Sequence, residues 1–122
     1  MLGNFQVKAM LATANPEAAR HFYGEVLGLS LVEEHPFAIL YDSAGIRVHI
    51  QKVTAFTPQP FTAMGWTVPD VTAAATELAR KGVRFERFEG MTQDDLGIWI
   101  PPGGATGVCW FKDPDGNLLS LS

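Results

Sequence analysis

Cysteine is nearly absent from this sequence, because the 122 residues include only Cys109. A single cysteine excludes a disulfide framework within the chain, and without a Cys-x-x-Cys pair or a Cys/His cluster no thiolate-based zinc site is expected. We therefore predict a reducing, cytoplasmic setting. Cys109 itself, in "GVCWF", is expected to be a small buried side chain, since no histidine lies near it in sequence to activate a thiolate.

Long apolar runs and basic stretches are also missing. No segment approaches the roughly 18 apolar residues of a membrane span, and the start "MLGNFQVKAM" lacks the basic-then-apolar order of a secretion signal. Nine Lys and Arg stand against thirteen Asp and Glu, for a formal charge of −4, and they form no basic stripe. We expect neither a membrane nor a nucleic acid as a partner. The 47% of hydrophobic residues predict one compact domain over residues 1–122.

A strand, a capped helix and a glycine stop occur twice along the chain. In "FQVKAMLATANPEAARHFYGEVLGL" a strand leads to an N-cap at Asn15, a helix to about Leu27 and a stop at Gly28. In "FTAMGWTVPDVTAAATELARKGVRF" the cap is Asp70 and the stop is Gly82. The two caps lie nearly half the chain length apart, so this pattern predicts an internal duplication.

Only β-rich runs follow each helix. The runs are "LSLVEE", "FAILYD" and "GIRVHIQKV" in the first half, and "GVRFERF", "GVCWFKD" and "NLLSLS" in the second. Each half is thus predicted as βαβββ, with module one at about 1–56, module two at about 60–122 and a proline-containing connection around 54–61. The segment 89–106, bounded by Gly and Pro, is predicted to be a lid or rim loop.

This order of elements, with "FYGEVLGL" at residues 22–29 and "FKDPDGNLLSL" at 111–121, resembles the vicinal oxygen chelate superfamily. That superfamily includes glyoxalase I, extradiol dioxygenases and the bleomycin and fosfomycin resistance proteins, and the resemblance covers essentially the whole chain. It implies an α+β fold in which two tandem βαβββ modules form a curved, incompletely closed eight-stranded mixed sheet. The helices would lie on its outer face and a ligand pocket in its concave face. It also implies a homodimer, which in some members exchanges halves.

The resemblance also implies where a metal would be bound. Metal-using members place ligands on four strands, at positions that correspond here to Lys8, His49, Ala63 and Ser120. A protonated lysine is a poor ligand for a divalent cation, alanine has no donor, and a serine stands where the family has glutamate. Even with Gln51, three protein ligands beside an open coordination position are not assembled. We predict that the metal has been lost, and we expect no cofactor and assign no catalytic residue.

Strand alternation suggests what lines the pocket instead. Residues in phase with those four positions would face the concavity, where Ala63 and Gly65 leave room, while Trp66 and the alternate apolar residues face the helices. Trp99 and Trp110, in or just after the long loop, would supply stacking walls. The predicted ligand-binding residues are Lys8, Met10, Arg47, His49, Gln51, Trp99, Trp110 and Ser120.

Each of these residues also has a plainer interpretation. His49 is either a pocket contact or an ordinary hydrogen-bonded strand histidine. Lys8 and Arg47 either bind an anionic group or are charges that keep strand edges from pairing. Trp99 and Trp110 fit either a site or a core, whereas Trp66 is expected in the core. The acidic pairs at 33–34 and 94–95 are expected to be solvated loop ends.

Three functions are compatible with the sequence. The ligand count favours a metal-independent binding protein of the bleomycin-resistance type, which holds a small organic molecule, aromatic or heterocyclic, without changing bonds. The alternative is a glyoxalase- or dioxygenase-like enzyme that uses a divalent metal through other ligands, or a metal-free lyase or isomerase that uses Lys8, His49 and a water. A third class is a dimeric scaffold or regulatory module without a small-molecule ligand.

Overall fold

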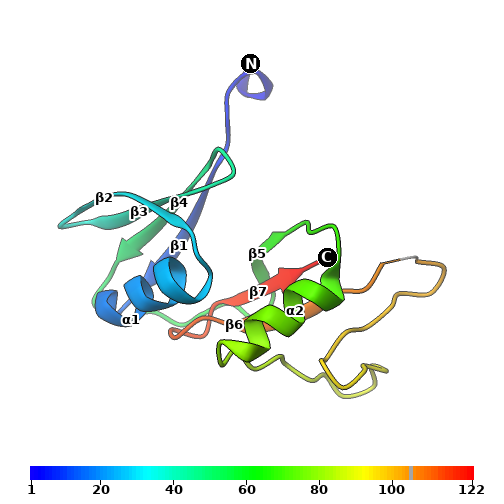
Figure 1. The fold of residues 1–122 in the computed structure, drawn as a ribbon. Helices are drawn as coiled ribbons and strands as arrows, with labels where there is room; N and C mark the ends of the chain where they lie inside the picture. The colour runs from blue at the N-terminus through cyan, green and yellow to red at the C-terminus, as the bar shows by residue number, and fades with distance from the viewer. Residues whose placement is uncertain (105) are drawn as a thin grey trace. The chain divides into compact units, whose positions relative to one another are not determined.

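The structure is a computed structural model that describes residues 1–104 and 106–122, and its chain divides into two compact units, residues 1–58 and 59–122. The boundary falls within the predicted connection. Unit 1 contains η1 (Leu2–Asn4), β1 (Lys8–Thr13), α1 (Pro16–Arg20), η2 (His21–Val26), β2 (Ser30–His35), β3 (Ala38–Ser43) and β4 (Ile46–Lys52). Unit 2 contains β5 (Thr62–Trp66), α2 (Val71–Arg80), β6 (Cys109–Lys112) and β7 (Leu118–Leu121) (Figure 1). None of the helices among the described residues is long and apolar enough to cross a bilayer.

Unit 1 is a four-stranded mixed sheet with one helical layer. The strand order is β1-β4-β3-β2, in which β1 pairs with β4 in parallel and the other pairs are antiparallel. The turn between β3 and β4 has positive φ at both Ala44 (49°) and Gly45 (89°), the geometry of a type I′ turn, whose twist suits a tight hairpin. This unit has the βαβββ order that the sequence predicts.

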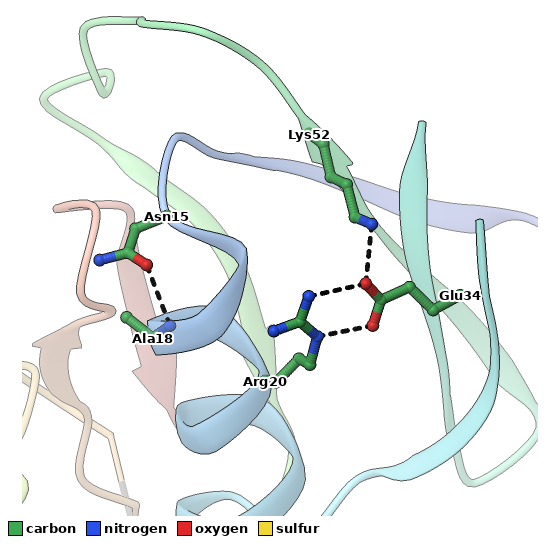
Figure 2. Close-up of polar contacts among 5 residues, drawn as sticks. All are labelled: Asn15, Ala18, Arg20, Glu34 and Lys52. Atoms are coloured by element: carbon green, nitrogen blue, oxygen red, sulfur yellow. Dashed lines mark hydrogen bonds and ion pairs between the residues drawn. The ribbon is translucent and has the colours of Figure 1, made fainter. Parts of the chain in front are cut away.

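The first helix begins as predicted and then changes its winding. The Asn15 side chain accepts a hydrogen bond from the Ala18 amide at 3.2 Å, which caps α1 (Figure 2). From His21 onward the helix is π-wound, and the Leu27 amide donates to the Phe22 carbonyl at 2.8 Å. A π-turn rotates the following side chains relative to α geometry, and Phe22 and Tyr23 are both buried here.

The core of unit 1 lies between this helix and one face of the sheet. The Tyr23 and Tyr41 rings lie 6.2 Å apart between centroids, so η2 covers the face of the sheet that carries Tyr41. The register places alternate residues of β1, β3 and β4 on that same face. Its buried hydrophobic members are Leu11, Ile39, Tyr41, Val48 and Ile50, and the polar Thr13 is buried beside them.

Unit 2 contains a three-stranded sheet of order β5-β7-β6, with α2 packed against β7. The Asp70 side chain caps α2 by accepting from the Ala73 amide at 3.0 Å, and Gly82 follows the helix with φ 95°, as predicted. Trp66 is half-buried and stacks on the fully buried Phe111 at 6.4 Å between ring centroids, so it lies on the predicted face of the sheet, at the border of the core. Cys109 is fully buried, as predicted, and burial followed by the nearby Asp94 raises the pKa of its thiol to about 11.

The predicted eight strands are corrected to seven among the described residues, in two sheets of four and three. "GVRFERF" is not a strand and keeps one isolated bridge, from Phe85 to Phe111. The physical reason lies in the Gln93 side chain. It donates to the Glu86 and Gly97 carbonyls and accepts from the Phe88 amide, at 2.7–2.9 Å. These bonds satisfy backbone groups that a strand ladder would otherwise use.

The segment 89–106 has local structure of its own. Gln93 bridges to Trp99, and Trp99 bridges in turn to Val108 just before β6. Within this segment Ala105 lies outside the described residues, and a lid role remains a prediction.

The hairpin between β6 and β7 is organised by a buried carboxylate. Asp113 Oδ1 accepts from the Asp115 and Asn117 amides at 3.0 and 2.9 Å, and its Oδ2 accepts from Asn117 Nδ2 at 2.8 Å. Asp113 and Asn117 are both buried, and Gly116 has φ 94°. "DPDGN" therefore builds a turn in which Asp113 bonds the residues that follow it.

Candidate functional site

The face of the unit 1 sheet that points away from the helix carries five of the predicted ligand residues. In the parallel register Lys8 lies opposite Arg47, and Met10 lies opposite His49. Gln51 lies two residues beyond His49 on β4, so its side chain is on the same face. We call this surface the open face of the unit 1 sheet, and it consists of Lys8, Met10, Arg47, His49 and Gln51 with the β3 and β2 residues in register with them.

The β3 and β2 residues complete three rows across this face. Asp42 lies opposite Arg47, Leu40 opposite His49, and Ala38 opposite Gln51. Glu33 and His35 of β2 continue the rows beyond Leu40 and Ala38. The open face thus combines charged groups in the first row with Met10, His49 and the buried Leu40 in the second, which ends at the carboxylate of Glu33.

His49 lies in the middle of the open face and is half-buried. Its pKa is lowered from the usual value first by burial and then by the positive charges of Lys8 and Arg47, with His35 acting in the same direction and Glu33 opposing it. A lowered pKa keeps the imidazole neutral at neutral pH, when one ring nitrogen is a donor and the other an acceptor.

On the helix-facing side of the same sheet, two cations are neutralised in part by one carboxylate. Glu34 of β2 binds Arg20 of α1 through two hydrogen bonds of 2.7 and 2.8 Å and Lys52 of β4 through one of 2.7 Å (Figure 2). The hydrogen bonds from Arg20 and then from Lys52 lower the pKa of the Glu34 carboxyl to about 2. Glu34 is therefore a strand residue holding two cations, and the prediction of a solvated loop end was wrong for it.

Ser120 and Trp110 lie side by side on the unit 2 sheet. They are opposite each other in the β6–β7 register, and Gly65 lies opposite Ser120 on the other side. A Cβ atom at Gly65 would collide with the Ser120 hydroxyl and lie 3.1 Å from the Ser120 carbonyl oxygen. The prediction that Gly65 leaves room for a ligand is corrected, because the serine side chain fills that space.

Ala63 is displaced from the regular ladder. Thr62 pairs with Leu118 and Met64 pairs with Leu119, so β5 has one more residue than β7 between these two pairs. Ala63 is this extra residue, which makes a β-bulge. The bulge changes the alternation after Thr62, which is why counting by twos along β5 does not reproduce its faces.

Three aromatic rings cluster beside Ser120. Trp110 contacts Phe88 edge-to-face at 5.3 Å and Trp99 in a tilted arrangement at 6.1 Å between ring centroids. The Trp110 indole N–H donates to the Thr62 hydroxyl at 3.2 Å, which fixes the orientation of the ring. Phe88 is 37% exposed, and both tryptophans are half-buried. We refer to Phe88, Trp99 and Trp110 as the aromatic cluster.

An open pocket of about 500 Å³ adjoins the aromatic cluster and shares Trp99 with it. Asp94 is on the wall of this pocket, where its Oδ1 accepts from the Leu96 and Ile98 amides at 2.9 Å. It is exposed and lies in a loop, as predicted. The volume of this pocket is in the range of small-molecule binding sites. The lining residues are Thr92, Gln93, Asp94, Ile98, Trp99, Ile100 and Pro102.

The family of this chain is decided by a sequence comparison. Residues 6–121 match the family model described as the Glyoxalase/Bleomycin resistance protein/Dioxygenase superfamily. The chain belongs to this superfamily. A comparison with curated proteins found no significant match.

Solved structures of the superfamily share the fold. A lactoylglutathione lyase from Agrobacterium tumefaciens is 16% identical with a TM-score of 0.67, and the match covers 96% of this chain and 91% of that one. A glyoxalase/bleomycin resistance protein from Streptomyces sp. CB03234 is 22% identical, with a TM-score of 0.62 and coverage of 95% and 99%. A glyoxalase family protein from Enterococcus faecalis is 20% identical, with a TM-score of 0.66 and coverage of 95% and 93%. At these identities the likeness concerns the fold alone.

The residues of this superfamily member do not fit the metal that the family resemblance implies. At the four corresponding positions Lys8 offers an ammonium, Ala63 no donor and Ser120 a hydroxyl packed against Gly65, which leaves His49. In the part of the chain that the structure describes, no three His, Cys, Asp or Glu side chains are grouped closely enough to hold a metal ion. A divalent cation would lack the three protein ligands that catalytic sites generally use.

The structure therefore brings the predicted residues together in two sets. Lys8, Met10, Arg47, His49 and Gln51 share the open face of unit 1. Trp99, Trp110 and Ser120 are neighbours in unit 2. Sequence reasoning missed Phe88, because "GVRFERF" was interpreted as a strand, and it also missed the apolar Leu40 beside His49.

Proposed function

We propose that this superfamily member binds a small organic molecule without a metal and releases it chemically unchanged. The observation that carries the proposal is the aromatic cluster next to the 500 Å³ pocket. Aromatic rings held in place beside an open pocket offer a large apolar contact area at low entropic cost. Trp110 is held by Thr62 in addition to its ring neighbours, so its face is prepared before a ligand arrives.

Metal independence is the second part of the proposal. It is supported by the donor set, since a single imidazole is the one ordinary metal ligand at the four corresponding positions. We further propose a cytoplasmic homodimer. The strands β1 and β2 are the outer strands of the unit 1 sheet, and an outer strand can pair with a strand of a second copy. Light scattering of the purified protein at micromolar concentration tests the dimer, and a monomer across that range would contradict it.

Tryptophan fluorescence tests ligand binding directly, because all three tryptophans lie in unit 2 and two of them belong to the aromatic cluster. We expect aromatic and heterocyclic compounds from a small-molecule screen to change the emission saturably at one site per chain. If no compound in a broad screen changes the emission of the wild type, the binding function is wrong. A bound compound recovered as a different molecule would instead establish an enzyme.

Metal titration tests the second part. We expect calorimetric titration with zinc, nickel, manganese and iron(II) to show no stoichiometric binding, and protein purified without chelator to carry no metal at one per chain. Tight binding at one site would overturn metal independence and favour glyoxalase- or dioxygenase-type chemistry. The variant His49→Ala is the control. If it binds a metal as the wild type does, the metal site does not use the His49 imidazole.

A further inference from the structure

We propose that the open face of the unit 1 sheet binds the carboxylate of an organic anion between Lys8 and Arg47. This inference rests on the proposed binding function and names the class of ligand that unit 1 would bind. It concerns residues of unit 1 only, and the aromatic cluster of unit 2 supplies a separate readout.

The first observation is that two cations are neighbours across adjacent strands. Lys8 and Arg47 are directly paired in the β1–β4 register, an arrangement in which like charges repel. Lys8 makes no ion pair with any residue that the structure describes, and Arg47 reaches Asp42 only at 3.9 Å. The Arg47 side chain remains 48% exposed, so its guanidinium is available to a ligand.

The two cations on the opposite face of the same sheet differ from Lys8 and Arg47 because they share a carboxylate. There Arg20 and Lys52 share the carboxylate of Glu34 at 2.7–2.8 Å (Figure 2). One face therefore holds two cations around a carboxylate from the chain itself, and the other holds two cations without one between them. A carboxylate from a ligand would complete the second pair as Glu34 completes the first.

Protection of a strand edge does not explain the pair. A charged residue on an edge strand discourages pairing with other chains, and this accounts for Lys8 because β1 is an edge. Arg47 lies on β4, which has β1 on one side and β3 on the other. Because β4 is an inner strand, Arg47 cannot serve to keep an edge of this sheet from pairing.

The charges select a monoanion. Lys8 and Arg47 bring two positive charges and Asp42, opposite Arg47, brings one negative charge, so one positive charge remains uncompensated in this row. A guanidinium matches the two oxygens of a carboxylate, and an ammonium adds a point charge from the neighbouring strand. In the next row the exposed Met10 offers an apolar contact and the half-buried His49 a neutral imidazole for the body of the ligand, and Glu33 lies at the far end of that row beyond the buried Leu40.

Nuclear magnetic resonance of the full chain tests the proposal with a matched pair of probes. Benzoate and its neutral analogue benzamide are titrated at equal concentrations while the backbone amides of residues 8–11 and 46–51 are followed. We expect benzoate to shift these amides saturably and benzamide to leave them unchanged. Lys8→Gln and Arg47→Gln should each weaken benzoate binding roughly tenfold, near the lower end of the effect of losing a charge-assisted hydrogen bond, because both side chains are exposed.

The controls separate local from general effects. Arg84→Gln removes one positive charge from an exposed position in unit 2, and benzoate affinity should stay within about twofold of the wild type. Lys8→Arg retains the charge and should retain most of the affinity. A loss in Arg84→Gln as large as in Lys8→Gln would overturn the proposal, because only net charge would then matter.

Other outcomes distinguish this proposal from the one on which it rests. Equal shifts with benzamide, or none with either probe, would overturn the carboxylate site, and tryptophan fluorescence would still decide whether the aromatic cluster binds a ligand. Binding of phenyl phosphate in preference to benzoate at the same amides would overturn the monoanion assignment. Loss of both the amide shifts and every fluorescence response would overturn the binding function itself.

Discussion

At the scale of single residues, Glu34 is the charged group whose titration should matter most to unit 1. Its carboxyl pKa of about 2 lies below the ordinary 4.5 because Arg20 and Lys52 donate hydrogen bonds to it. A carboxyl with a lowered folded-state pKa stabilises the fold above its unfolded pKa, and this contribution is lost as the pH falls toward the folded pKa. The relevant window therefore runs from about pH 4.5 down to about pH 2.

We predict that Glu34→Gln lowers the free energy of unfolding at pH 7 and that the difference from the wild type shrinks as the pH falls through this window. Denaturant unfolding at a series of pH values measures it. Glu25→Gln is the matched control, because Glu25 contacts the exposed His21 at the helix surface, and we expect a smaller effect. A wild-type advantage that persisted unchanged at pH 2 would contradict the assignment of the stabilising charge to Glu34.

Trp110 tests whether the aromatic cluster serves binding or only packing. We predict that Trp110→Ala weakens a ligand found by fluorescence about tenfold, because a stacking face is lost, whereas Trp110→Phe keeps most of the affinity. Thr62→Val removes the partner of the indole N–H and should have a small effect on both affinity and stability. His49→Ala, a separate change in unit 1, should weaken benzoate binding to the open face more than it lowers stability. An unchanged affinity in Trp110→Ala would remove Trp110 from the site at the aromatic cluster, and an unchanged benzoate affinity in His49→Ala would remove His49 from the site on the open face.

At the scale of elements, the β6–β7 hairpin depends on one side chain. Asp113→Ala would remove the oxygens that accept from the buried Asn117 side-chain amide and from the Asp115 and Asn117 backbone N–H groups. Since each buried unsatisfied donor costs about 1–3 kcal/mol, we predict a loss of roughly 2–4 kcal/mol in the free energy of unfolding. Asp113→Asn keeps an oxygen that can accept the two backbone bonds and should cost less. Urea unfolding of both variants provides the measurement, and an equal cost would show that charge, not the bonds to Oδ1, is decisive.

The elements that the sequence predicted correctly are those with strong local signals. Asn15 and Asp70 as caps, Gly28 and Gly82 as stops, and strict alternation along β1 and β4 all depend on neighbours in the sequence. The failures depend on distant contacts. Gln93 replaces strand bonds around Glu86 and Phe88, and Ser120 fills the space beside Gly65, and neither effect leaves a periodic pattern. The residues of the open face were predictable because they follow from alternation along β1 and β4. The contact of Glu34 with Arg20 of α1 was not predictable, because it joins residues of different elements.

At the scale of the whole molecule, the length of the two units predicts how cooperatively the chain unfolds. Units of this length, residues 1–58 and 59–122, would be marginal as independent folds, because a chain of about 60 residues buries only about 60% of its unfolded surface. Both tyrosines lie in unit 1 and all three tryptophans in unit 2. We therefore predict that tyrosine near-ultraviolet circular dichroism and tryptophan emission give one coincident unfolding transition. Separate midpoints for the two probes would mean that the chain holds two independent domains.

The parallel pairing of β1 with β4 has a consequence for the order of folding. The hairpins that join β2, β3 and β4 connect neighbours in the chain, whereas β1 reaches β4 only after all the intervening residues have been arranged. Closing such a long loop costs entropy before any contact is gained, so β1 should dock late, after the transition state. Truncating its buried side chain with Leu11→Ala should then speed unfolding while leaving the refolding rate nearly unchanged. The strand that carries Lys8 would accordingly be the first part of the unit 1 sheet to detach when the protein opens.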